Sequence, residues 1–576
     1  MHRALQILEV VDSIFQAADK DVLPICAVLC RAWELPALRV LWRAPTNLTP
    51  LFRLLGPLSD AYANSIHRPS NKAVDPKLWD RFQRYSKLIR ILNISIGLQY
   101  SAVNAPDKPR PVVSIATFQE VALMAVSSGQ PLFPSITSLN LWLLSREAVV
   151  CAGPLFLSPL SRINLTWVSE TESGFPWVAS QLRKQAGSIR SLTLDFIPTS
   201  FNPEVEVCDH LVAMISSFQG LVELNIPCFL AKHLPAWKDI ASLPNLEWLG
   251  FHNRRDLNIG GVGPADVYGL SSFNDGFRSL THFVGEGPVD VALSLFQNST
   301  PLPALRSIQF KAQEPLSDNK EFPLLLESIV ALAPNLEELS LTIDAPDDIL
   351  VEDFEALTKL SSLRGIWIRM ERMLTWNDEE YKSFAKTIPQ LTQLYLAMDP
   401  VYYPCLPRST LLAISYIVSS CPNIKELGVF VEAVPSTLPD EDIAIEPLPP
   451  GLTINFGFSL ITDPLLVAVA LYRMCGQNLI LVTAGSTYSF PRASIKMRDE
   501  EEDDETFADR VACWEEAIHT LGRLRPLIGT LLRPLAVPLW QLNAYVESGT
   551  PINENSESVR RLVSVVRASG FIGSVL

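Results

Sequence analysis

The chain has 576 residues, of which 48% are hydrophobic and 19% are charged, and its formal net charge is −15. This composition excludes a disordered chain, and the negative charge argues against broad binding to nucleic acid or to an anionic membrane, which needs clustered Lys and Arg. The length leaves room for several domains or for one elongated domain.

Three short runs of apolar residues at helical spacing lie between His2 and Trp42. The runs are Leu8, Val11, Ile14 and Phe15; then Val22, Ile25, Cys26 and Leu29, capped by Asp19 or Asp21; then Trp33, Ala37, Leu38, Leu41 and Trp42, with Pro36 in the first turn. A unit of about 40 residues rarely stabilises itself without a staple or a partner. We therefore expect a docking partner; the alternative is a helical cap on a larger domain.

The stretch from Cys26 to Trp33, followed by Leu41-Trp42, resembles the C-x-x-V/L-C/S-R-x-W core of an F-box. The resemblance covers about 42 residues and departs at Leu8, where the family usually has Pro, which loosens the start of the first helix. It implies that a Skp-type adaptor, and through it a cullin, binds here. The adaptor-binding residues that it implies are Leu5, Ile7, Leu8, Ile14, Phe15, Val28, Trp33, Leu38, Leu41 and Trp42.

A pattern close to Pro-x-Leu-x-x-Leu-x-Leu recurs along the middle of the chain, as in Pro334–Leu341 and Pro389–Leu396. Its copies are spaced by about 29 residues, the range of leucine-rich repeats, and helical patterns such as Glu321–Ala333 lie between them. The first apolar anchors of the copies are residues 136, 160, 189, 221, 246, 280, 305, 336, 363, 391 and 424, and an earlier copy is expected at Ile89, Leu92 and Ile94. The chain has 44 prolines, more than is usual for its length. A Pro before each strand suits the exit from a helix, which accounts for much of this excess.

These copies resemble the irregular leucine-rich repeats that follow F-boxes, although the usual Asn after the strand is missing and the copy at Leu280 is degenerate. The predicted fold class is α/β: a three-helix F-box-like unit, then a leucine-rich-repeat solenoid (a horseshoe) with a parallel concave sheet and outer helices. The predicted domains are 1–43 (F-box-like), 44–85 (linker helices), 86–434 (solenoid) and 435–576 (C-terminal capping region with acidic loops and helices).

The predicted capping region begins with an acidic, Pro-rich loop, Leu438–Gly451. Further strands are expected at Gly451–Phe458 and Leu479–Ala484, and the acidic run Arg498–Glu505 precedes a helix from Thr506 to Leu521. We interpret this run as a solvated loop whose negative charges stabilise the N-terminus of the helix. The alternative is an acidic interaction segment. The apolar run Pro464–Met474 is too short to span a membrane.

No nucleotide-binding, hydrolase or zinc-protease motif occurs, so we expect neither an enzyme nor a cofactor or metal. The nine cysteines are odd in number and scattered, which indicates reduced thiols, and Glu9 and Asp12 interrupt any signal-peptide core. The expected location is therefore cytoplasmic, nuclear or both.

The residues between the strand leucines should line the concave sheet. Trp142 is an early example, and Trp367 and Tyr395 are expected to stack in adjacent repeats with Phe430 one strand further. Aromatic side chains beside an Arg are typical of binding hot spots; the alternative is that loops or the C-terminal segment cover them. The predicted substrate-binding residues are Trp248, His252, Trp367, Arg369, Tyr395 and Phe430.

Together these features favour a substrate-recognition subunit of an SCF-type cullin-RING ubiquitin ligase. Its F-box would bind the adaptor and its repeats an unknown target protein, with no binding of nucleic acid or membrane. The alternative is a leucine-rich-repeat scaffold for protein–protein interaction with no ligase role, which a decayed F-box with Leu8 would indicate.

Overall fold

The structure is a computed structural model divided into two units, unit 1 (Met1–Asp347 and Glu352–Ile368) and unit 2 (Asp348–Val351 and Arg369–Leu576). The unit boundary falls inside the predicted repeat region of 86–434. The described residues are 7–58, 65–66, 74–96, 112–143, 146–168, 174–197, 205–227, 239–252, 276–297, 299–345, 348–370, 372, 374–397, 407–434, 448–457, 459–475, 481–483 and 512–520.

Unit 1 begins with the three predicted short helices, which pack around one small core. These helices are α1 (Leu8–Ala17), α2 (Leu23–Leu29) and α3 (Arg31–Arg43). The core consists of Val11, Phe15, Leu23, Cys26 and Ala37. Phe15 meets Trp33 edge-on, with ring centroids 5.7 Å apart. Two further helices, α4 (Thr49–Arg53) and α5 (Pro76–Ser86), lead to the first strands.

Three details of these helices differ from the prediction. No side chain caps α2, whose N-cap residue is Val22 rather than an Asp. The buried face of α2 carries Leu23 and Cys26, because α2 is only two turns long and turns these two residues toward α1 and α3. Pro36 lies inside α3 and not in its first turn, since α3 begins at Arg31, with only Cys30 between it and the end of α2.

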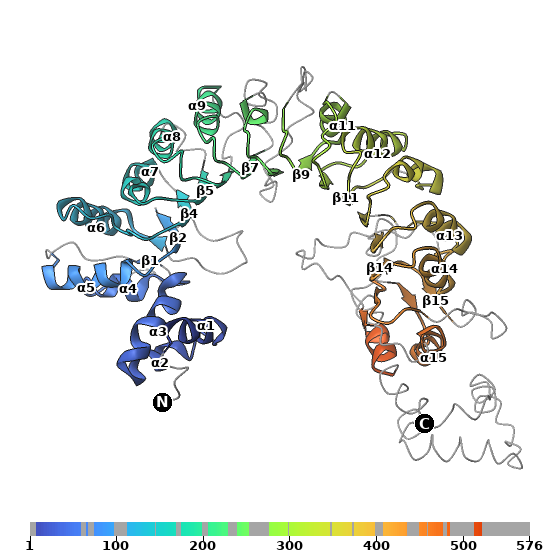
Figure 1. Cartoon of the computed structure of the whole chain (residues 1–576), viewed down its shortest axis with the longest axis horizontal. Helices are drawn as coiled ribbons and strands as arrows, with labels where there is room; N and C mark the ends of the chain where they lie inside the picture. Colours follow the sequence, from blue (N-terminus) through green and yellow to red (C-terminus); the bar gives the residue numbers. More distant parts are fainter. Residues whose placement is uncertain are drawn as a thin grey trace, which may run out of the picture. The chain divides into compact units, whose positions relative to one another are not determined.

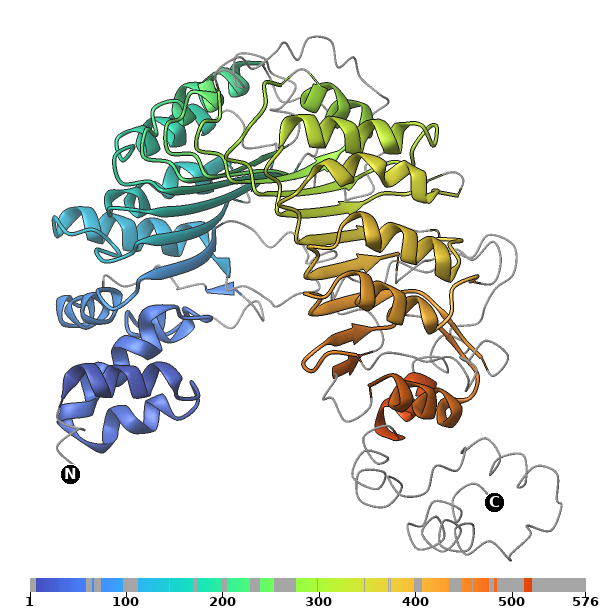
Figure 2. The same cartoon turned by 45° about the vertical axis from the view of Figure 1, so that its right-hand side comes forward.

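Parallel strands follow one another across a single sheet in unit 1, in the order β1-β3-β2-β4-β5-β6-β7-β8-β9-β10-β11-β12. Helices lie along one side of this sheet, as the strands and helices of unit 1 in Figures 1 and 2 show. The strands are β1 (Ser65–Ile66), β2 (Ile91–Ile96), β3 (Val112–Val113), β4 (Ser138–Leu143), β5 (Arg162–Val168), β6 (Ser191–Ile197), β7 (Glu223–Pro227), β8 (Trp248–His252), β9 (His282–Gly287), β10 (Ser307–Ala312), β11 (Glu338–Thr342) and β12 (Gly365–Arg369). The helices are α6 (Ile115–Ser127), α7 (Arg146–Cys151), α8 (Phe175–Arg183), α9 (Val205–Ile215), α11 (Val289–Gln297) and α12 (Glu321–Leu332), with 3-10 helices at Gly153–Leu157 and Val351–Lys359.

The predicted repeat anchors all lie in the core. Each of the eleven anchors, from Ile136 to Ile424, is at most 4% exposed, and Ile89 of the earlier copy is completely buried. The strands alternate as predicted, and β4 has every second residue buried from Leu139 to Leu143. The copy at Leu280, predicted to be degenerate, still forms a regular strand, β9, because Phe283 and Leu280 are buried as in the other copies.

The prolines of the repeat lie in tight turns. In the copy at Pro334, the N–H of Leu336 donates to the carbonyl of Ala333 at 3.1 Å, which places Pro334 at the second position of a β-turn. Proline favours this position because its fixed φ suits the turn. The same turn precedes the anchors Leu305, Leu391 and Ile424. The prolines therefore set a turn between helix and strand, in addition to ending the helix.

One carbonyl before each strand accepts two N–H groups from the next repeat. The carbonyl of Arg90 accepts from Thr137 and Ser138 at 2.8 and 3.0 Å, and the carbonyl of Thr137 accepts from Ser161 and Arg162 in the same way. The pattern recurs at the carbonyls of Ser161, Arg190, Val222, Glu247, Thr281, Arg306 and Glu337. Each repeat thus begins its strand on the backbone of its neighbour.

Unit 2 contains the same strand–helix succession on a smaller scale, with strands in the order β13-β14-β16-β18 and a separate pair, β15 and β17. Trp514 attaches the last described helix to the segment after β16. Its ring stacks on Phe456 with centroids 4.1 Å apart, and its N–H donates to the carbonyl of Ser459 at 2.8 Å. Its elements are α13 (Asp378–Thr387), β13 (Gln393–Leu396), α14 (Leu412–Ser420), β14 (Glu426–Val429), β15 (Glu432–Ala433), β16 (Thr453–Asn455), β17 (Leu460–Ile461), α15 (Pro464–Cys475), β18 (Leu481–Thr483) and a helix over 512–520.

The predicted strands Gly451–Phe458 and Leu479–Ala484 agree with β16 and β18, and the helix predicted over Thr506–Leu521 agrees with the helix at 512–520. The apolar run Pro464–Met474 forms the helix α15. The acidic run Arg498–Glu505 lies outside the described residues. Of the predicted loop Leu438–Gly451, only residues 448–451 are described. Among the described helices, none is long and apolar enough to cross a membrane.

The thiols of Cys26, Cys30, Cys151 and Cys421 form no disulfide, and the thiol of Cys421 is completely buried in unit 2. Burial raises the pKa of Cys421 to about 12, so the thiolate that reacts with electrophiles is scarce at neutral pH. We expect Cys421 to stay unmodified by a maleimide at pH 7.5 while partly exposed Cys30 and Cys513 react, with the products located by peptide mass spectrometry. Labelling of Cys421 at the rate of Cys513 in the folded protein would contradict this burial.

Candidate functional site

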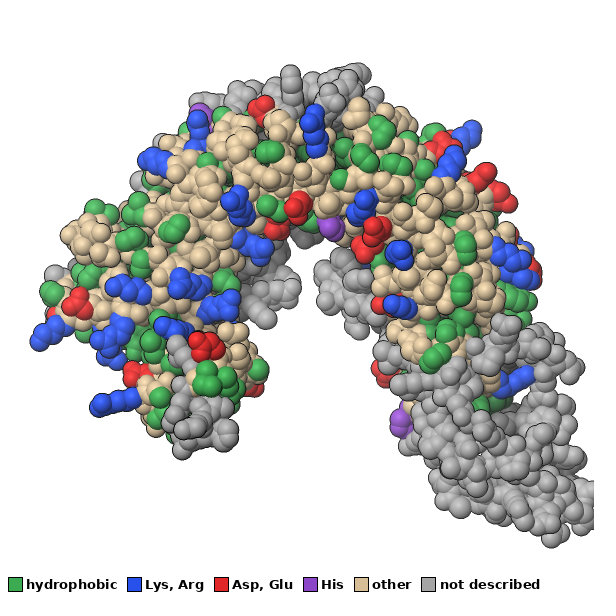
Figure 3. All heavy atoms as spheres, in the orientation of Figure 1, with side chains coloured by type: hydrophobic (Ala, Val, Ile, Leu, Met, Phe, Trp, Pro, Cys, Tyr) green, Lys and Arg blue, Asp and Glu red, His purple; other side chains and the backbone are tan. Residues whose placement is uncertain are grey.

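The N-terminal helices expose large hydrophobic side chains. Thirteen such side chains are exposed in the described residues, and seven of them lie between Ile7 and Leu35. We call these seven the apolar face; its members are Ile7, Ile14, Val22, Ile25, Val28, Leu29 and Leu35. Exposure reaches 83% at Val28 and 62% at Leu29. In Figure 3, hydrophobic side chains are visible on this part of unit 1. Exposed apolar residues concentrated in one short segment in this way indicate an interaction surface.

The predicted adaptor-binding residues divide between this face and the core. Ile7, Ile14 and Val28 belong to the apolar face. Phe15 does not, because it is only 4% exposed and its ring packs against Trp33; this is a correction to the prediction. Trp33 and Leu41 pack against the same core, Leu38 is half-buried, and Trp42 contacts Tyr85 of α5 with ring centroids 5.3 Å apart. Leu5 and the side chain of Leu8 lie outside the described residues.

The division has a physical reason. Three short helices supply few large side chains, and two of them, Phe15 and Trp33, bury apolar area by packing against each other. Since α2 has room to bury only Leu23 and Cys26, its other large apolar residues, Ile25, Val28 and Leu29, stay in solvent. Ile25 and Leu29 were predicted to share the apolar stripe of the helix with Cys26, so their exposure was not predicted.

The second candidate surface is the side of the unit 1 sheet opposite the buried leucines, which we call the open face. Parallel register places Asn93, Asn140, Asn164, Thr193 and Asn225 side by side on β2 and β4 to β7. These side chains are half-buried, and the amide of Asn140 donates to the amide oxygen of Asn93. The ladder continues through Gly250, Val284, Gln309 and Ser340. This row was not predicted, although Asn between two strand leucines was its signal.

The neighbouring row on the open face is more closed than predicted. Trp142 lies between Ser95 and Thr166 in register and is half-buried. Ser95, Thr166 and Asp195 are at most 5% exposed, and the hydroxyl of Thr166 donates to a carboxylate oxygen of Asp195 at 3.5 Å. Only part of the predicted binding surface is therefore accessible in this row.

Two of the predicted binding tryptophans lie over glycines. A Cβ placed on Gly250 would stand 2.5 Å from the indole of Trp248, and one on Gly365 would stand 2.4 Å from the indole of Trp367. Residues two apart on a strand share a face, so the six-membered ring of each indole reaches the space over the glycine two residues away on its own strand. Trp248 and Trp367 are half-buried in this position. We call Gly250 and Gly365 the glycine seats of these rings.

The other predicted substrate-binding residues have different outcomes. Phe430 is 2% exposed, so the prediction that it lies on the surface was wrong. It follows the end of β14, and the residue of β14 in register with Tyr395 is Gly428. The hydroxyl of Tyr395 donates to Glu426 at 3.0 Å, and Arg369 at the end of β12 is half-buried. The side chain of His252 lies outside the described residues. The stacking of Trp367 and Tyr395 stays a prediction.

Within the described residues, no group of three or more His, Cys, Asp or Glu side chains could hold a metal ion. The buried phenol of Tyr381 has its pKa raised, first by loss of solvation and second by the charge of Asp378. Tyr381 packs against Trp376 with ring centroids 5.3 Å apart, and this contact gives the phenol a structural role.

No family model and no curated protein matches the chain. Among solved structures, a protein from Bacteroides fragilis has 18% identity and a TM-score of 0.23, covering 39% of this chain and 70% of that one. The complex of TLR13 with ssRNA13 has 12% identity and a TM-score of 0.30, covering 69% of this chain and 44% of that one. Scores at this level carry no argument about function.

The glycine seat of Trp248 can be tested directly. We expect Gly250→Ala to displace the indole, because the added methyl group has no space beneath the ring. In protein labelled with 5-fluorotryptophan, the fluorine resonance that Trp248→Phe removes should shift in Gly250→Ala. Gly187→Ala is the control, since a Cβ on Gly187 meets no atom within 4 Å. An unchanged Trp248 resonance in Gly250→Ala would show that the ring does not rest on the glycine.

Proposed function

We propose that this chain is the substrate-recognition subunit of an SCF-type cullin-RING ubiquitin ligase, with an F-box at its N-terminal helices and leucine-rich repeats behind them. The single observation that carries the proposal is the apolar face, which gathers seven exposed hydrophobic side chains on helices whose shared core is small. Burial of one such side chain by a partner contributes about 1.5–3 kcal/mol. The helices therefore gain much of their stability from docking.

The resemblance of Cys26–Trp33 to the F-box core supports a Skp-type adaptor as that partner. In the proposed complex, Val28 and its neighbours on α2 contact the adaptor, while Phe15 and Trp33 hold the helices in place from inside. The adaptor connects the chain to a cullin. No catalytic step is assigned to the chain itself, because the ligase chemistry belongs to other subunits.

The open face of the sheet is the proposed site for the target protein. Its amide ladder offers donors and acceptors in a regular row, and Trp248 offers a large apolar surface beside it. A row of polar groups with an aromatic residue next to it is typical of protein-binding surfaces. The proposal places the chain in the cytoplasm or the nucleus, where such ligases act.

Adaptor binding tests the proposal. We expect the full chain to co-purify with a co-expressed Skp-type adaptor, and Ile25→Asp with Val28→Asp to abolish this, because two buried charges cannot be paired in an apolar interface. The matched control is Leu123→Asp with Val126→Asp on α6, an equally spaced pair that is also exposed. Circular dichroism melting compares the folding of the three proteins.

Two results would contradict the proposal. In the first, the α2 double variant retains the adaptor as well as the α6 control does. In the second, the wild-type chain recovers no adaptor, and a leucine-rich-repeat scaffold without a ligase role then becomes the better interpretation.

A further inference from the structure

A basic cleft lies in unit 1 where α3 meets the beginnings of the first strands. Its volume is about 680 Å³, which is within the range of small-molecule sites. Its lining contains five cationic side chains and one anionic side chain: Arg39, Arg43, Lys87, Arg90 and Arg162, with Asp12. Such an excess of positive charge is unexpected in a chain of net charge −15. Lys and Arg side chains are visible over this part of unit 1 in Figure 3.

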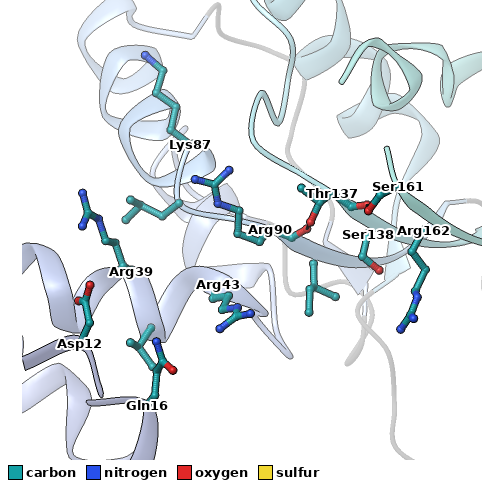
Figure 4. Close-up of a pocket in the computed structure, with 13 residues that line it drawn as sticks. Asp12, Gln16, Arg39, Arg43, Lys87, Arg90, Thr137, Ser138, Ser161 and Arg162 are labelled. Atoms are coloured by element: carbon teal, nitrogen blue, oxygen red, sulfur yellow. Dashed lines mark hydrogen bonds between the residues drawn. The ribbon is translucent and has the colours of Figure 1, made fainter. Parts of the chain in front are cut away.

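The cations come from two sides of the cleft. Arg39 and Arg43 extend from α3, whereas Lys87 and Arg90 come from the segment between α5 and β2, and Arg162 begins β5 (Figure 4). The two sides are joined by the backbone, because the N–H of Arg90 donates to the carbonyl of Arg43 at 2.9 Å. The contact of Trp42 with Tyr85 holds α3 against α5 beside them. The fold therefore holds together the backbone segments that carry these cations.

Most of these charges have no ionic partner. In the described part of the chain, Arg162 pairs with Glu223 at 3.4 Å, but Arg39, Arg43, Lys87 and Arg90 form no salt bridge. The guanidinium of Arg90 donates to the carbonyl of Ser135 at 3.1 Å, which aims the group without neutralising it. Asp12 also lines the cleft, and one of its carboxylate oxygens is buried with no hydrogen-bond partner. Because the lining contains only this one carboxylate, the net charge of the cleft is positive.

We propose that this cleft binds a small soluble molecule that carries at least two phosphate groups. Planar guanidinium groups match phosphate oxygens in pairs, and two walls of cations require more than one phosphate to be satisfied together. A ligand held by α3 on one side and Arg90 on the other would fasten the N-terminal helices to the first strands. The site is separate from the apolar face, so the inference does not rest on the proposed function.

Titration of the full chain with tripolyphosphate tests the proposal. Calorimetry measures the affinity at a fixed ionic strength of about 0.15 M. We expect one saturable site, at least about tenfold weaker in Arg39→Gln with Arg43→Gln, since two charge-assisted contacts are lost. Lys87→Gln, on the opposite wall, should also weaken binding. Arg183→Gln with Lys184→Gln on α8 removes the same charge from an exposed place outside the cleft and should leave the affinity unchanged.

Melting temperature gives a second readout, because a ligand that bridges the two walls should raise it in the wild-type chain and not in the α3 variant. The proposal is overturned if tripolyphosphate does not bind, or if the α3 and α8 variants bind it equally. It is also overturned if the cleft variants lose binding only to vesicles that contain a bisphosphorylated phosphoinositide, or only to a doubly phosphorylated peptide. Those results would assign the cleft to a membrane or to a protein partner.

Discussion

Backbone hydrogen bonds between neighbouring repeats are the constraint on which unit 1 depends. A single carbonyl, such as that of Arg90 or Thr137, accepts two N–H groups of the next repeat at the start of the strand. An isolated repeat would leave these groups unpaired and its anchor leucine in solvent, at a cost that the short chain segment has no means to offset. Each repeat is therefore stable only as part of the row, and the row fixes the register of every side chain on the open face.

This register converts a loose sequence pattern into ordered surfaces. The asparagines of β2, β4, β5 and β7 are far apart in the sequence, and the parallel pairing brings them into one line. The cleft beside α3 arises in the same way, since Arg90 directly precedes β2 and Arg162 is the first residue of β5. The N-terminal helices are different, because their small core leaves an apolar surface that the repeats do not cover.

The periodic part of the fold could be predicted from the sequence, and the particular surfaces could be predicted only in part. Anchors such as Leu221 and Leu336 follow a period that burial imposes on every repeat, so their positions were predictable. Phe430 was misplaced because a strand's end is set by its partner, and β14 ends one residue earlier. The helix α2 has more apolar residues than its two turns can bury, so periodicity alone could not distinguish buried Cys26 from exposed Ile25.

The cations of the cleft form no local motif, because the sequence separates them by up to 123 positions, from Arg39 to Arg162. Repeated Arg at strand starts was the available signal.

The glycine seats have a consequence for the entropy of binding. A tryptophan on an exposed sheet normally samples several rotamers, and freezing a side chain of this kind on association costs about 0.5–1.5 kcal/mol. Trp248 lies in the space that a Cβ of Gly250 would occupy, so its ring is already confined before any partner arrives. For a ring held in this way, the conformational cost is met during folding and not on association.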